Sequence, residues 1–448
     1  MIFKPYIYLL GIGGIGMSAL ARYFKRAGHK VAGYDRWASP LCRQLEAEGM
    51  SIHYEDNPAL IPPAFRDTEQ TLVIYTPAIP AEHREKIYFE TQGFPCHKRA
   101  EILGALSQNY RCLAVAGTHG KTTTSTLLAH ILRSAQVPSL AFLGGIAADY
   151  NTNFWGNPGD AIMVTEADEY DRSFLQLMPE TAVITGLQAD HLDVYKDADD
   201  LKNTFLRFAG RATKTVIAAE QSNLPFPYYG WSEQCRWQGS NVRIENHQYV
   251  FDLEGPDFSM QDIKSPLPGK HNLENIMAAV ALASAVGVKP GLIKKGIENF
   301  RGIKRRFEYH ISSKNQIYID DYAHHPDEIR ALLSTVKALY PKKKLTVIFQ
   351  PHLFSRTRDF MLGFAESLLL ADFIYLLPVY PAREKAIPGI DSEKLATVMG
   401  APEKTQVMTE TEILDKFKRN KPQLLLTVGA GNIDQLIHPL KKLLLNSK

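Results

Sequence analysis

The sequence predicts an α/β protein of three domains whose sheets are mostly parallel. Short apolar strands alternate with helical segments along the chain, which is the pattern of strand–helix–strand units. Glycine-rich turns follow two of these strands, one near residue 11 and one near residue 117. The length of 448 residues is large for one core and fits about three domains. We expect these domains to span residues 1–108, 109–308 and 309–448.

The first block opens with a strand at residues 6–10, a glycine loop, a helix over residues 18–27 and a strand over residues 30–34. The glycines of the loop are Gly11, Gly13, Gly14 and Gly16. They allow the backbone to approach a pyrophosphate closely. The same pattern fits NAD with Asp35 on a ribose, and glycines serving only helix–strand packing are a further alternative. Nothing downstream supplies hydride chemistry, so we favour a nucleotide-linked substrate.

The second block begins with a strand at residues 112–116, a glycine-bracketed turn and a helix that includes residues 125–132. Such a turn directs backbone N–H groups and a helix N-terminus at one point, which suits the phosphates of ATP. The residues of this P-loop are Gly117, Thr118, His119, Gly120, Lys121, Thr122 and Thr123. Lys121 would reach the β- and γ-phosphates, and the Thr122 hydroxyl would ligate Mg²⁺.

The P-loop departs from the usual motif because Val115 stands where the first glycine is expected. The alternative interpretation is a chance Gly-Lys-Thr sequence in an ordinary turn. The strand before it and the helix after it favour the nucleotide site.

Carboxylates follow the apolar strand expected at residues 161–165. Acids at the carboxyl end of a strand beside a P-loop can hold Mg²⁺, so we select Glu166 as a metal ligand. A solvated acidic turn is the alternative. His191 follows the next expected strand, at residues 181–185, and could ligate a second divalent ion.

Further elements complete the first two blocks: strands at residues 72–75 and 215–218, and a helix at residues 100–106. A helix is expected from Asn272 to Ala285, with Asn272 as its N-cap and Gly287 as its stop. Asn275, near the start of this helix, could contact an adenine edge, or it could be a solvated surface residue.

The third block has a strand at residues 316–320 followed by a helix at residues 326–339. Pro326 suits the first helical position. Further buried strands are expected at residues 344–349, 373–377 and 424–428. Two candidates for polar recognition of substrate or nucleotide are His324 and His325. Two candidates to hold a carboxylate or phosphate are Arg356 and Arg358, which follow a strand. Ordinary surface arginines are the alternative.

The charge balance and the cysteines limit the classes of partner. The net charge is +3, so we expect no nucleic-acid partner. The four cysteines are scattered and form no CxxC motif, which fits a reducing cytoplasm. The most apolar late run is too short to span a bilayer, and the glycine-rich N-terminal segment makes a poor signal peptide, so we expect a cytoplasmic protein without membrane insertion.

Taken together, these motifs resemble the Mur ligases, which form amide bonds at the expense of ATP in peptidoglycan synthesis. The glycine loop is similar to the family's uridine-diphosphate loop, and the P-loop shares the missing first glycine. The acidic segment at Glu166 and the segment ending at His191 match the family's two magnesium segments. Segments 269–275 and 305–307 match its nucleotide-contacting segments, which implies ATP contacts for Asn275 and Arg306.

Three further segments resemble the alanine-adding members of the family: residues 320–326, 350–359 and 379–389. The resemblance implies a Rossmann-like UDP-binding domain, a central P-loop ATPase-like domain and a C-terminal Rossmann-like domain. It implies UDP-N-acetylmuramate, L-alanine, ATP and Mg²⁺ as ligands, with Lys121, Glu166 and His191 as the catalytic set. The assembly would be a monomer or homodimer, and domain closure would complete the site.

The chain departs from this family pattern at two places. Gly186-Leu-Gln188 stands where the family has Asn-Ile-Glu, and Leu353 stands where it has an arginine. Glu169-Tyr170 is similar to the relative that ligates a recycled tripeptide to UDP-N-acetylmuramate. Two alternatives from other classes are an NAD-dependent oxidoreductase and a P-loop ATPase that acts as a switch without ligation.

Overall fold

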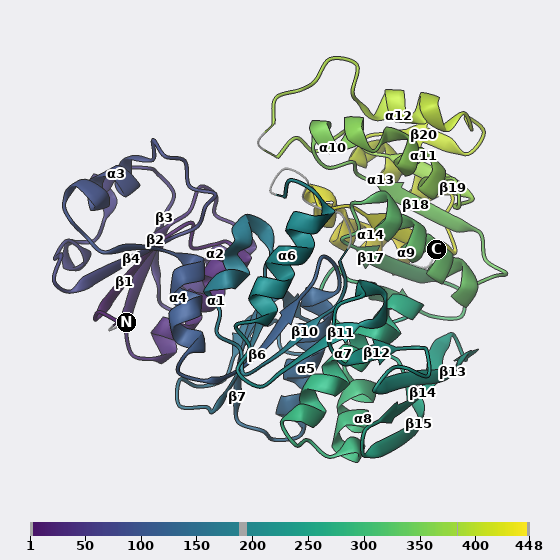
Figure 1. Ribbon diagram of the computed structural model, residues 1–448. Coiled ribbons are helices and arrows are strands. Elements are labelled where there is room, and N and C mark those ends of the chain that lie inside the picture. The colour runs from purple at the N-terminus through teal and green to yellow at the C-terminus, as the bar shows by residue number, and fades with distance from the viewer. Residues whose placement is uncertain (1–2, 188–194, 383, 446–448) are drawn as a thin grey trace. The chain divides into compact units, whose positions relative to one another are not determined.

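The computed structural model describes residues 3–187, 195–382 and 384–445. The chain is a mixed α/β protein with three mostly parallel sheets, as the sequence predicts (Figure 1). It divides into two compact units. The first unit comprises Met1–Val242, Val250–Pro266 and Lys270–Arg301, and the second comprises Arg243–Tyr249, Leu267–Gly269 and Gly302–Lys448. Within the described ranges, no helix is long and apolar enough to cross a membrane.

The first sheet has the strand order β3-β2-β1-β4-β5, and its paired strands are parallel. Its strands are β1 (Tyr6–Leu10), β2 (Lys30–Tyr34), β3 (Ser51–His53), β4 (Thr71–Tyr75) and β5 (Cys96–Lys98). Its helices are α1 (Ile15–Arg26), α2 (Pro40–Ala47), α3 (Arg84–Thr91) and α4 (Arg99–Ser107), with short turns η1 (Pro58–Leu60) and η2 (Pro63–Phe65). The order reverses between β1 and β4, which is the point where open α/β sheets bind ligands.

Helix α1 begins three residues before the expected Ser18, so that part of the prediction is wrong. The turn closes early because Gly11 adopts a φ of 83° and its carbonyl accepts the amide of Gly14. A residue with a Cβ would be strained at that φ. The last two glycines of the loop therefore lie at or inside the start of the helix.

The middle sheet has ten strands in the order β15-β14-β13-β12-β11-β10-β6-β9-β7-β8. Its strands are β6 (Arg111–Ala116), β7 (Ser139–Ala147), β8 (Thr152–Trp155), β9 (Ile162–Ala167), β10 (Thr181–Ile184), β11 (Thr215–Ala219), β12 (Tyr228–Gly230), β13 (Trp237–Glu245), β14 (Gln248–Gly255) and β15 (Phe258–Lys264). Its helical segments are α5 (Lys121–Ser134), η3 (Tyr170–Gln176), α6 (Ala198–Ala209), η4 (Glu220–Ser222), α7 (Lys270–Ala285) and α8 (Pro290–Asn299). Strand β6 pairs in parallel with both β9 and β10, so their carboxyl ends share one edge.

Helix α7 begins at Lys270, so Asn272 lies inside it and the N-cap prediction is wrong. The expected stop is confirmed, because the helix ends at Ala285 and Gly287 adopts a φ of 86°. Helix α7 contacts α5, which follows the P-loop.

The third sheet has the order β16-β17-β21-β18-β19-β20. Its strands are β16 (Glu308–Ser312), β17 (Ile317–Asp321), β18 (Leu345–Phe349), β19 (Phe373–Leu376), β20 (Thr405–Val407) and β21 (Leu424–Val428). Its helices are α9 (Pro326–Leu339), α10 (Phe354–Asp359), α11 (Met361–Leu368), α12 (Ser392–Met399), α13 (Glu410–Arg419), η5 (Asn432–Leu436) and α14 (Ile437–Leu445). The predicted bounds of α9 are confirmed. The domain boundaries at 108 and 308 stay predictions, with the third sheet starting at Glu308.

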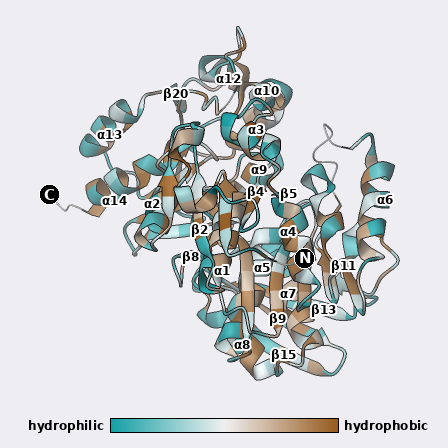
Figure 2. Cartoon of the chain, turned by 90° about the vertical axis from the view of Figure 1, so that its left-hand side faces the viewer, coloured by the Kyte–Doolittle hydropathy of each residue, from teal (hydrophilic) through white to brown (hydrophobic). Residues whose placement is uncertain are grey.

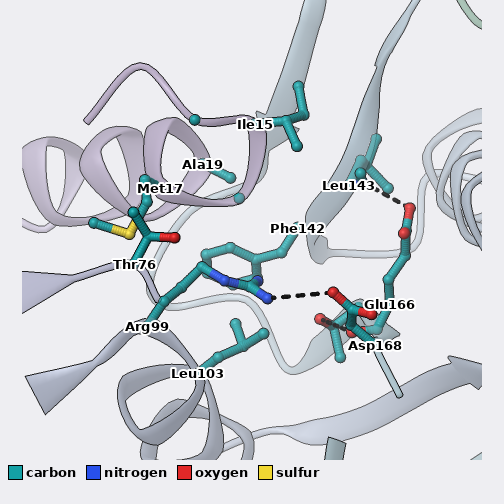
Figure 3. Close-up of a pocket in the computed structure, with 14 residues that line it drawn as sticks. Ile15, Met17, Ala19, Thr76, Arg99, Leu103, Phe142, Leu143, Glu166 and Asp168 are labelled. Carbon is teal, nitrogen blue, oxygen red and sulfur yellow. Dashed lines mark hydrogen bonds and ion pairs between the residues drawn. The ribbon is translucent and has the colours of Figure 1, made fainter. Parts of the chain in front are cut away.

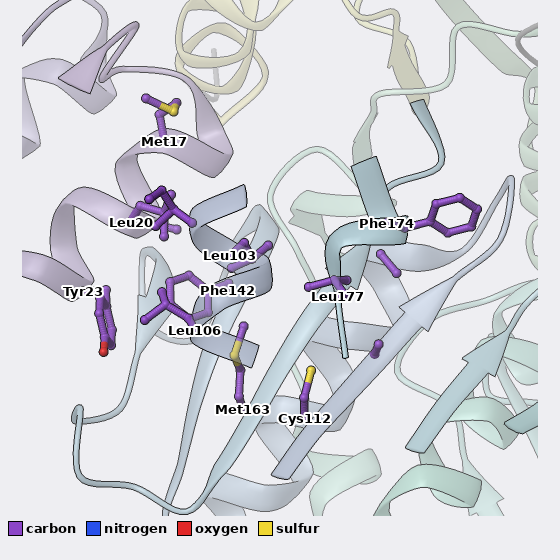
Figure 4. Close-up of a cluster of buried hydrophobic side chains, with 14 of the residues drawn as sticks. Met17, Leu20, Tyr23, Leu103, Leu106, Cys112, Phe142, Met163, Phe174 and Leu177 are labelled. Atoms are coloured by element: carbon purple, nitrogen blue, oxygen red, sulfur yellow. The ribbon is translucent and has the colours of Figure 1, made fainter. Parts of the chain in front are cut away.

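One apolar core joins the first sheet's helices to the middle sheet (Figure 4). Leu20 of α1 and Leu103 of α4 belong to it with Phe142 of β7 and Met163 of β9, and all four are buried. Each large apolar side chain buried in this way contributes about 1.5–3 kcal/mol. This shared core packs α1 against β7 and β8. By contrast, the surface helices α6 and α13 alternate hydrophilic and hydrophobic residues (Figure 2).

Candidate active site

The glycine loop after β1 is fixed by Asp35. The Asp35 Oδ2 accepts the amide of Gly13 at 2.8 Å, and its Oδ1 accepts the amide of Trp37 at 3.3 Å. A Cβ on Gly13 would lie 2.3 Å from Cys42 Sγ and 2.9 Å from this carboxylate, so a larger residue there would displace both side chains. Asp35 therefore positions the loop, and its predicted contact with a ribose stays a prediction.

A pocket of about 380 Å³ runs from this loop toward the carboxyl end of β9 (Figure 3). Its lining begins at Gly14, Ile15, Gly16 and Met17 of the loop and α1. It continues through Thr76 after β4, Arg99 and Leu103 of α4, and residues 142–144 of β7. It ends at Glu166 and Asp168. The pocket thus joins the predicted pyrophosphate loop to the predicted metal ligand.

The P-loop lies between β6 and α5, as predicted. Gly117 has a φ of 134° and Gly120 a φ of 79°, conformations that favour glycine. The Thr118 amide donates to the carbonyl of Gly186 at 3.2 Å, and the Thr185 hydroxyl donates to the carbonyl of His119. The loop is therefore fastened to the segment after β10, while Thr123 is buried in the first turn of α5.

Lys121 is held by a buried carboxylate. Its Nζ lies 2.6 and 2.9 Å from the two carboxylate oxygens of Glu169 and donates to the carbonyl of Gly117 at 2.7 Å. The Glu169 side chain is fully buried, and that of Lys121 is 15% exposed. The ammonium is thus pre-positioned along the loop, where a phosphate would have to compete with Glu169.

Glu166 faces the hydroxyls of the first turn of α5. Its Oε2 accepts from the Thr122 hydroxyl at 3.3 Å, and its Oε1 accepts from the Ser125 hydroxyl at 3.2 Å and from the Gly144 amide at 2.7 Å. Burial raises the pKa of this carboxyl, which the amide of Gly144 and the charge of Lys121 oppose. A carboxylate beside a P-loop hydroxyl is a donor set that suits Mg²⁺. His191, the other predicted ligand, lies outside the described residues.

Asn275 is buried against the P-loop rather than solvated. Its Oδ1 accepts from the Thr124 hydroxyl at 3.3 Å, and its Nδ2 donates to Asn272 at 3.1 Å. A Cβ on Gly120 would collide with the Asn275 amide. Asn275 therefore braces the loop, and its contact with adenine stays a prediction.

In the second unit, Arg306 lies over the ring of Tyr322, with its guanidinium carbon 5.4 Å from the ring centroid. The neighbouring Asp321, at the end of β17, accepts the amides of Phe307 at 2.7 Å and Ala323 at 2.8 Å. Burial raises the pKa of Asp321 to about 6, opposed by the charge of Arg306. The charge of Arg306 thus acts on a buried carboxyl at the carboxyl end of β17.

The two predicted histidines differ in their contacts. His325 caps α9, because its Nδ1 accepts the amide of Asp327 at 3.4 Å and Glu328 accepts the His325 amide at 3.2 Å. His324 is half-buried, and burial lowers its pKa. His325 therefore has a structural function in α9, and its contact with a ligand stays a prediction.

Arg356 and Arg358 both lie on α10 but have different surroundings. Arg356 Nη1 lies 3.4 Å from His352 Nδ1, and burial lowers the pKa of His352 to about 4. Arg358 is half exposed and pairs with Asp359 at 2.7 Å. Leu353, just before α10, has a φ of 70°, which is strained for a residue with a side chain. The binding roles of both arginines stay predictions.

Sequence reasoning did not select Arg99, Glu169 or Asp321. The sequence does contain one feature that points to Arg99. A cation at the first position of a helix is unfavourable, because the helix dipole places partial positive charge there. Glu169 was seen only as one acid in a cluster, since its pairing with Lys121 joins residues 48 apart. Asp321 lies in segment 320–326, which the sequence marks as similar to the family, but no sequence pattern distinguishes it from Asp320.

The fold and this site define a multidomain α/β nucleotide-binding protein in which a P-loop faces a carboxylate at one sheet edge. Comparison with known protein families then shows to which family of such proteins the chain belongs. Residues 6–111 match the Mur ligase family, catalytic domain, residues 115–283 match the Mur ligase middle domain, and residues 305–431 match the Mur ligase, glutamate ligase domain. The chain belongs to the Mur ligase family.

Similar proteins cover almost the whole chain. The UDP-N-acetylmuramate--L-alanine ligase of Flavobacterium johnsoniae is 46% identical over 98% of this chain and 97% of its own. That of Parabacteroides distasonis is 45% identical over 98% and 97%. The crystal structure of the UDP-N-acetylmuramate-alanine ligase of Thermotoga maritima has a TM-score of 0.83 at 26% identity, covering 98% of both chains.

Proposed function

We propose that this protein is an ATP-dependent ligase that joins L-alanine to the lactyl carboxylate of UDP-N-acetylmuramate, a step in peptidoglycan precursor synthesis. The observation that carries this proposal is the continuous pocket from the glycine loop to Glu166, beside the P-loop. In this pocket the carboxylate of the sugar nucleotide could lie next to the γ-phosphate of ATP. Relatives of this activity at 45–46% identity support the choice of substrates.

The proposed reaction has two chemical steps. The lactyl carboxylate attacks the γ-phosphorus of ATP, releasing ADP and leaving an acyl phosphate. The alanine amine then attacks the acyl carbon, and the tetrahedral intermediate expels inorganic phosphate. Phosphoryl transfer of this kind needs positioning and charge neutralisation more than a protein nucleophile.

The residues of the first unit supply that neutralisation. Lys121 moves from Glu169 toward the β- and γ-phosphate oxygens, while the P-loop amides hold the phosphate chain. We propose Thr122 and Glu166 as ligands of Mg²⁺, with His191 for a second ion. Bound Mg²⁺ offsets the repulsion between the carboxylate and the γ-phosphate.

The second unit supplies the remaining proposed contacts. Arg306 is assigned to ATP, and His324, His325, Arg356 and Arg358 to the substrates. Because Leu353 stands where the family has an arginine, we assign the alanine carboxylate to Arg356, whose guanidinium lies beside His352. We also propose a cytoplasmic location, because the four cysteines of the described chain are free. A monomer or homodimer stays a prediction.

The test is phosphate release from Mg-ATP in the presence of UDP-N-acetylmuramate and different amino substrates. We expect release that requires both the sugar nucleotide and L-alanine, and the same assay with glycine or L-serine measures the amino-acid preference. Release only with L-alanyl-γ-D-glutamyl-meso-diaminopimelate would make the protein a recycling ligase instead. Release that needs no sugar nucleotide would contradict the ligase function altogether.

A further inference from the structure

A buried polar network that the reaction scheme does not use joins helix α1 to strand β8. Its centre is Asn153, whose side chain is fully buried. Asn153 belongs to β8, which pairs with β7 in the middle sheet, whereas α1 belongs to the first sheet. Burying an amide is unfavourable unless its polar atoms are hydrogen-bonded. The partners of Asn153 therefore show what this side chain contributes.

Both polar atoms of the Asn153 amide are bonded to α1. Its Nδ2 donates to the carbonyl oxygen of Ile15 and, at 2.9 Å, to the hydroxyl oxygen of Ser18. Its Oδ1 accepts from Nη1 of Arg22. These partners fix the orientation of the amide, because a guanidinium only donates and a carbonyl oxygen only accepts. One side chain of β8 thus binds the first two turns of α1.

Arg22 is itself held in place by residues of the first sheet's domain. It is buried, and its Nη2 and Nε donate to the two carboxylate oxygens of Glu48 at 2.7 and 3.1 Å. Its Nη2 also donates to Oε1 of Gln44 at 3.3 Å. A guanidinium bound to both oxygens of a carboxylate directs its remaining N–H groups along fixed lines. The donor that Asn153 meets is therefore pre-positioned.

The network is next to the pocket in both of the elements that it joins. Ile15 and Gly16 of α1 line the pocket, and so do residues 142–144 of β7, the neighbour of β8. Figure 3 shows the start of α1 and Glu166 at this pocket. A shift of α1 along β8 would therefore change the distance between the glycine loop and Glu166.

We propose that Asn153 is a positioning residue for ligation. Together with Arg22 it fixes α1 against β8 at the one position in which the acid end of the sugar nucleotide reaches the γ-phosphate. This inference rests on the proposed function. A misplacement of about 1 Å, caused far from the reacting atoms, can lower a rate about 100-fold. The groups that bind each nucleotide stay the same, so the network acts on kcat and not on affinity.

The experiment compares kcat with ligand affinity for Asn153→Asp in the full-length protein. The aspartate keeps an acceptor for Arg22 but has no donor for Ile15 and Ser18, so the start of α1 loses its attachment to β8. We expect kcat for ligation to fall at least about tenfold. The Kd of UDP and the Kd of Mg-ATP, both measured by calorimetry, should stay unchanged. Each kcat is divided by the fraction of molecules that bind UDP, so that loss of folded protein does not count as loss of rate.

Two further variants sharpen the test. Ser18→Ala removes one acceptor of the Asn153 amide and keeps the bond to Ile15, so it should lower kcat in the same direction but less. Arg26→Gln is the matched control. Arg26, the last residue of α1, also bonds across to the segment after β8, through the carbonyl of Gly156 at 2.8 Å, but at the helix end that does not line the pocket. Its kcat should equal that of the wild type.

The outcomes separate this inference from the function on which it rests. A wild-type kcat in both Asn153→Asp and Ser18→Ala would overturn it, because the network would then only stabilise the fold. An equal fall in Arg26→Gln and Asn153→Asp would overturn it too, since any loosening of α1 would then have the same effect. So would a loss of activity explained entirely by a raised Kd of UDP. All three results leave the ligase function intact, whereas absence of ligation by the wild type would overturn both.

Discussion

At the scale of single residues, the pair Lys121–Glu169 connects stability with catalysis. Both groups are charged, and Glu169 is fully buried. Such a pair adds little to stability as a whole, but removing one partner leaves an uncompensated buried charge. The P-loop lysine is therefore both a proposed catalytic group and the counter-ion of a buried acid.

Lys121→Ala should abolish ligation while UDP affinity stays near that of the wild type. The reason is that the proposed diphosphate site is the glycine loop at the start of α1, and Lys121 is not among the residues that line the pocket beside it. Phosphate release and UDP calorimetry on the same preparation test this. Loss of UDP affinity in a folded Lys121→Ala variant would contradict the separation of the two sites.

The same substitution should lower the free energy of unfolding by about 3–5 kcal/mol, because Glu169 loses its partner. Adding Glu169→Gln should recover most of that loss without restoring activity. Urea denaturation of the two variants measures the difference. Equal stability of the single and double variants would show that Glu169 is not destabilised by the loss of Lys121.

A buried carboxyl in the first sheet makes stability depend on pH. Glu85 is fully buried, accepts the Tyr8 hydroxyl at 2.7 Å, and burial raises its pKa from 4.5 to about 7. Between these values the folded chain binds the proton more tightly than the unfolded chain. The free energy of unfolding therefore falls as the pH rises from 4.5 to 7.

Glu85→Gln should remove this part of the pH dependence. At pH 5 the variant should match the wild type, and at pH 8 it should be more stable by up to about 3 kcal/mol, at 1.36 kcal/mol per pKa unit. Denaturant unfolding of both proteins at the two pH values measures this. A difference that is the same at both pH values would exclude titration of Glu85 as the cause.

At the scale of elements, helix ends form the proposed sites. Helix α1 begins at the glycine loop, and helix α5 begins at the P-loop. Helix α9 begins shortly after β17, whose last two residues are acidic. Helix α9 shows how a structural need can resemble a binding motif. Its capping box uses His325 and Glu328, within the segment that suggested substrate recognition.

His325→Ala should cost about 1 kcal/mol of stability, as for other N-cap losses, whereas His325→Asn should cost little because asparagine caps well. Because we assign His325 to the substrates, His325→Asn should raise the KM for L-alanine while leaving stability near that of the wild type. Thermal unfolding and the KM for L-alanine measure the two effects. An unchanged KM in the stable asparagine variant would show that His325 only caps α9.

At the scale of the whole molecule, the two compact units predict two unfolding transitions. The proposed UDP contacts all lie in the first unit. UDP at about one hundred times its Kd should stabilise that unit by about 2.7 kcal/mol and leave the other transition in place. Differential scanning calorimetry with and without UDP tests this. An equal shift of every transition would indicate that the chain unfolds as one cooperative unit.

The sequence predicted much of the fold because strand and helix patterns are local. The strand at 30–34 and the helix at 326–339 were placed at their observed bounds, since apolar spacing and the proline at the first helical position act over a few residues. Errors occurred at helix starts. The sequence predicts helix starts at Ser18 and Asn272, but glycine turns and tertiary contacts let α1 and α7 begin earlier.

The sequence by itself determined the class of fold, the P-loop, the glycine loop after β1 and the resemblance to the Mur ligases. Each of these depends on short contiguous segments, whose backbone conformation is decided by residues close together in the sequence. Only the tertiary structure decided that Glu169 holds Lys121, that Asn275 braces the P-loop and that Arg99 lines the pocket. These pairings join residues that are far apart in the chain. They arise where sheet edges and helix N-termini converge, which is a property of packing and not of any one segment.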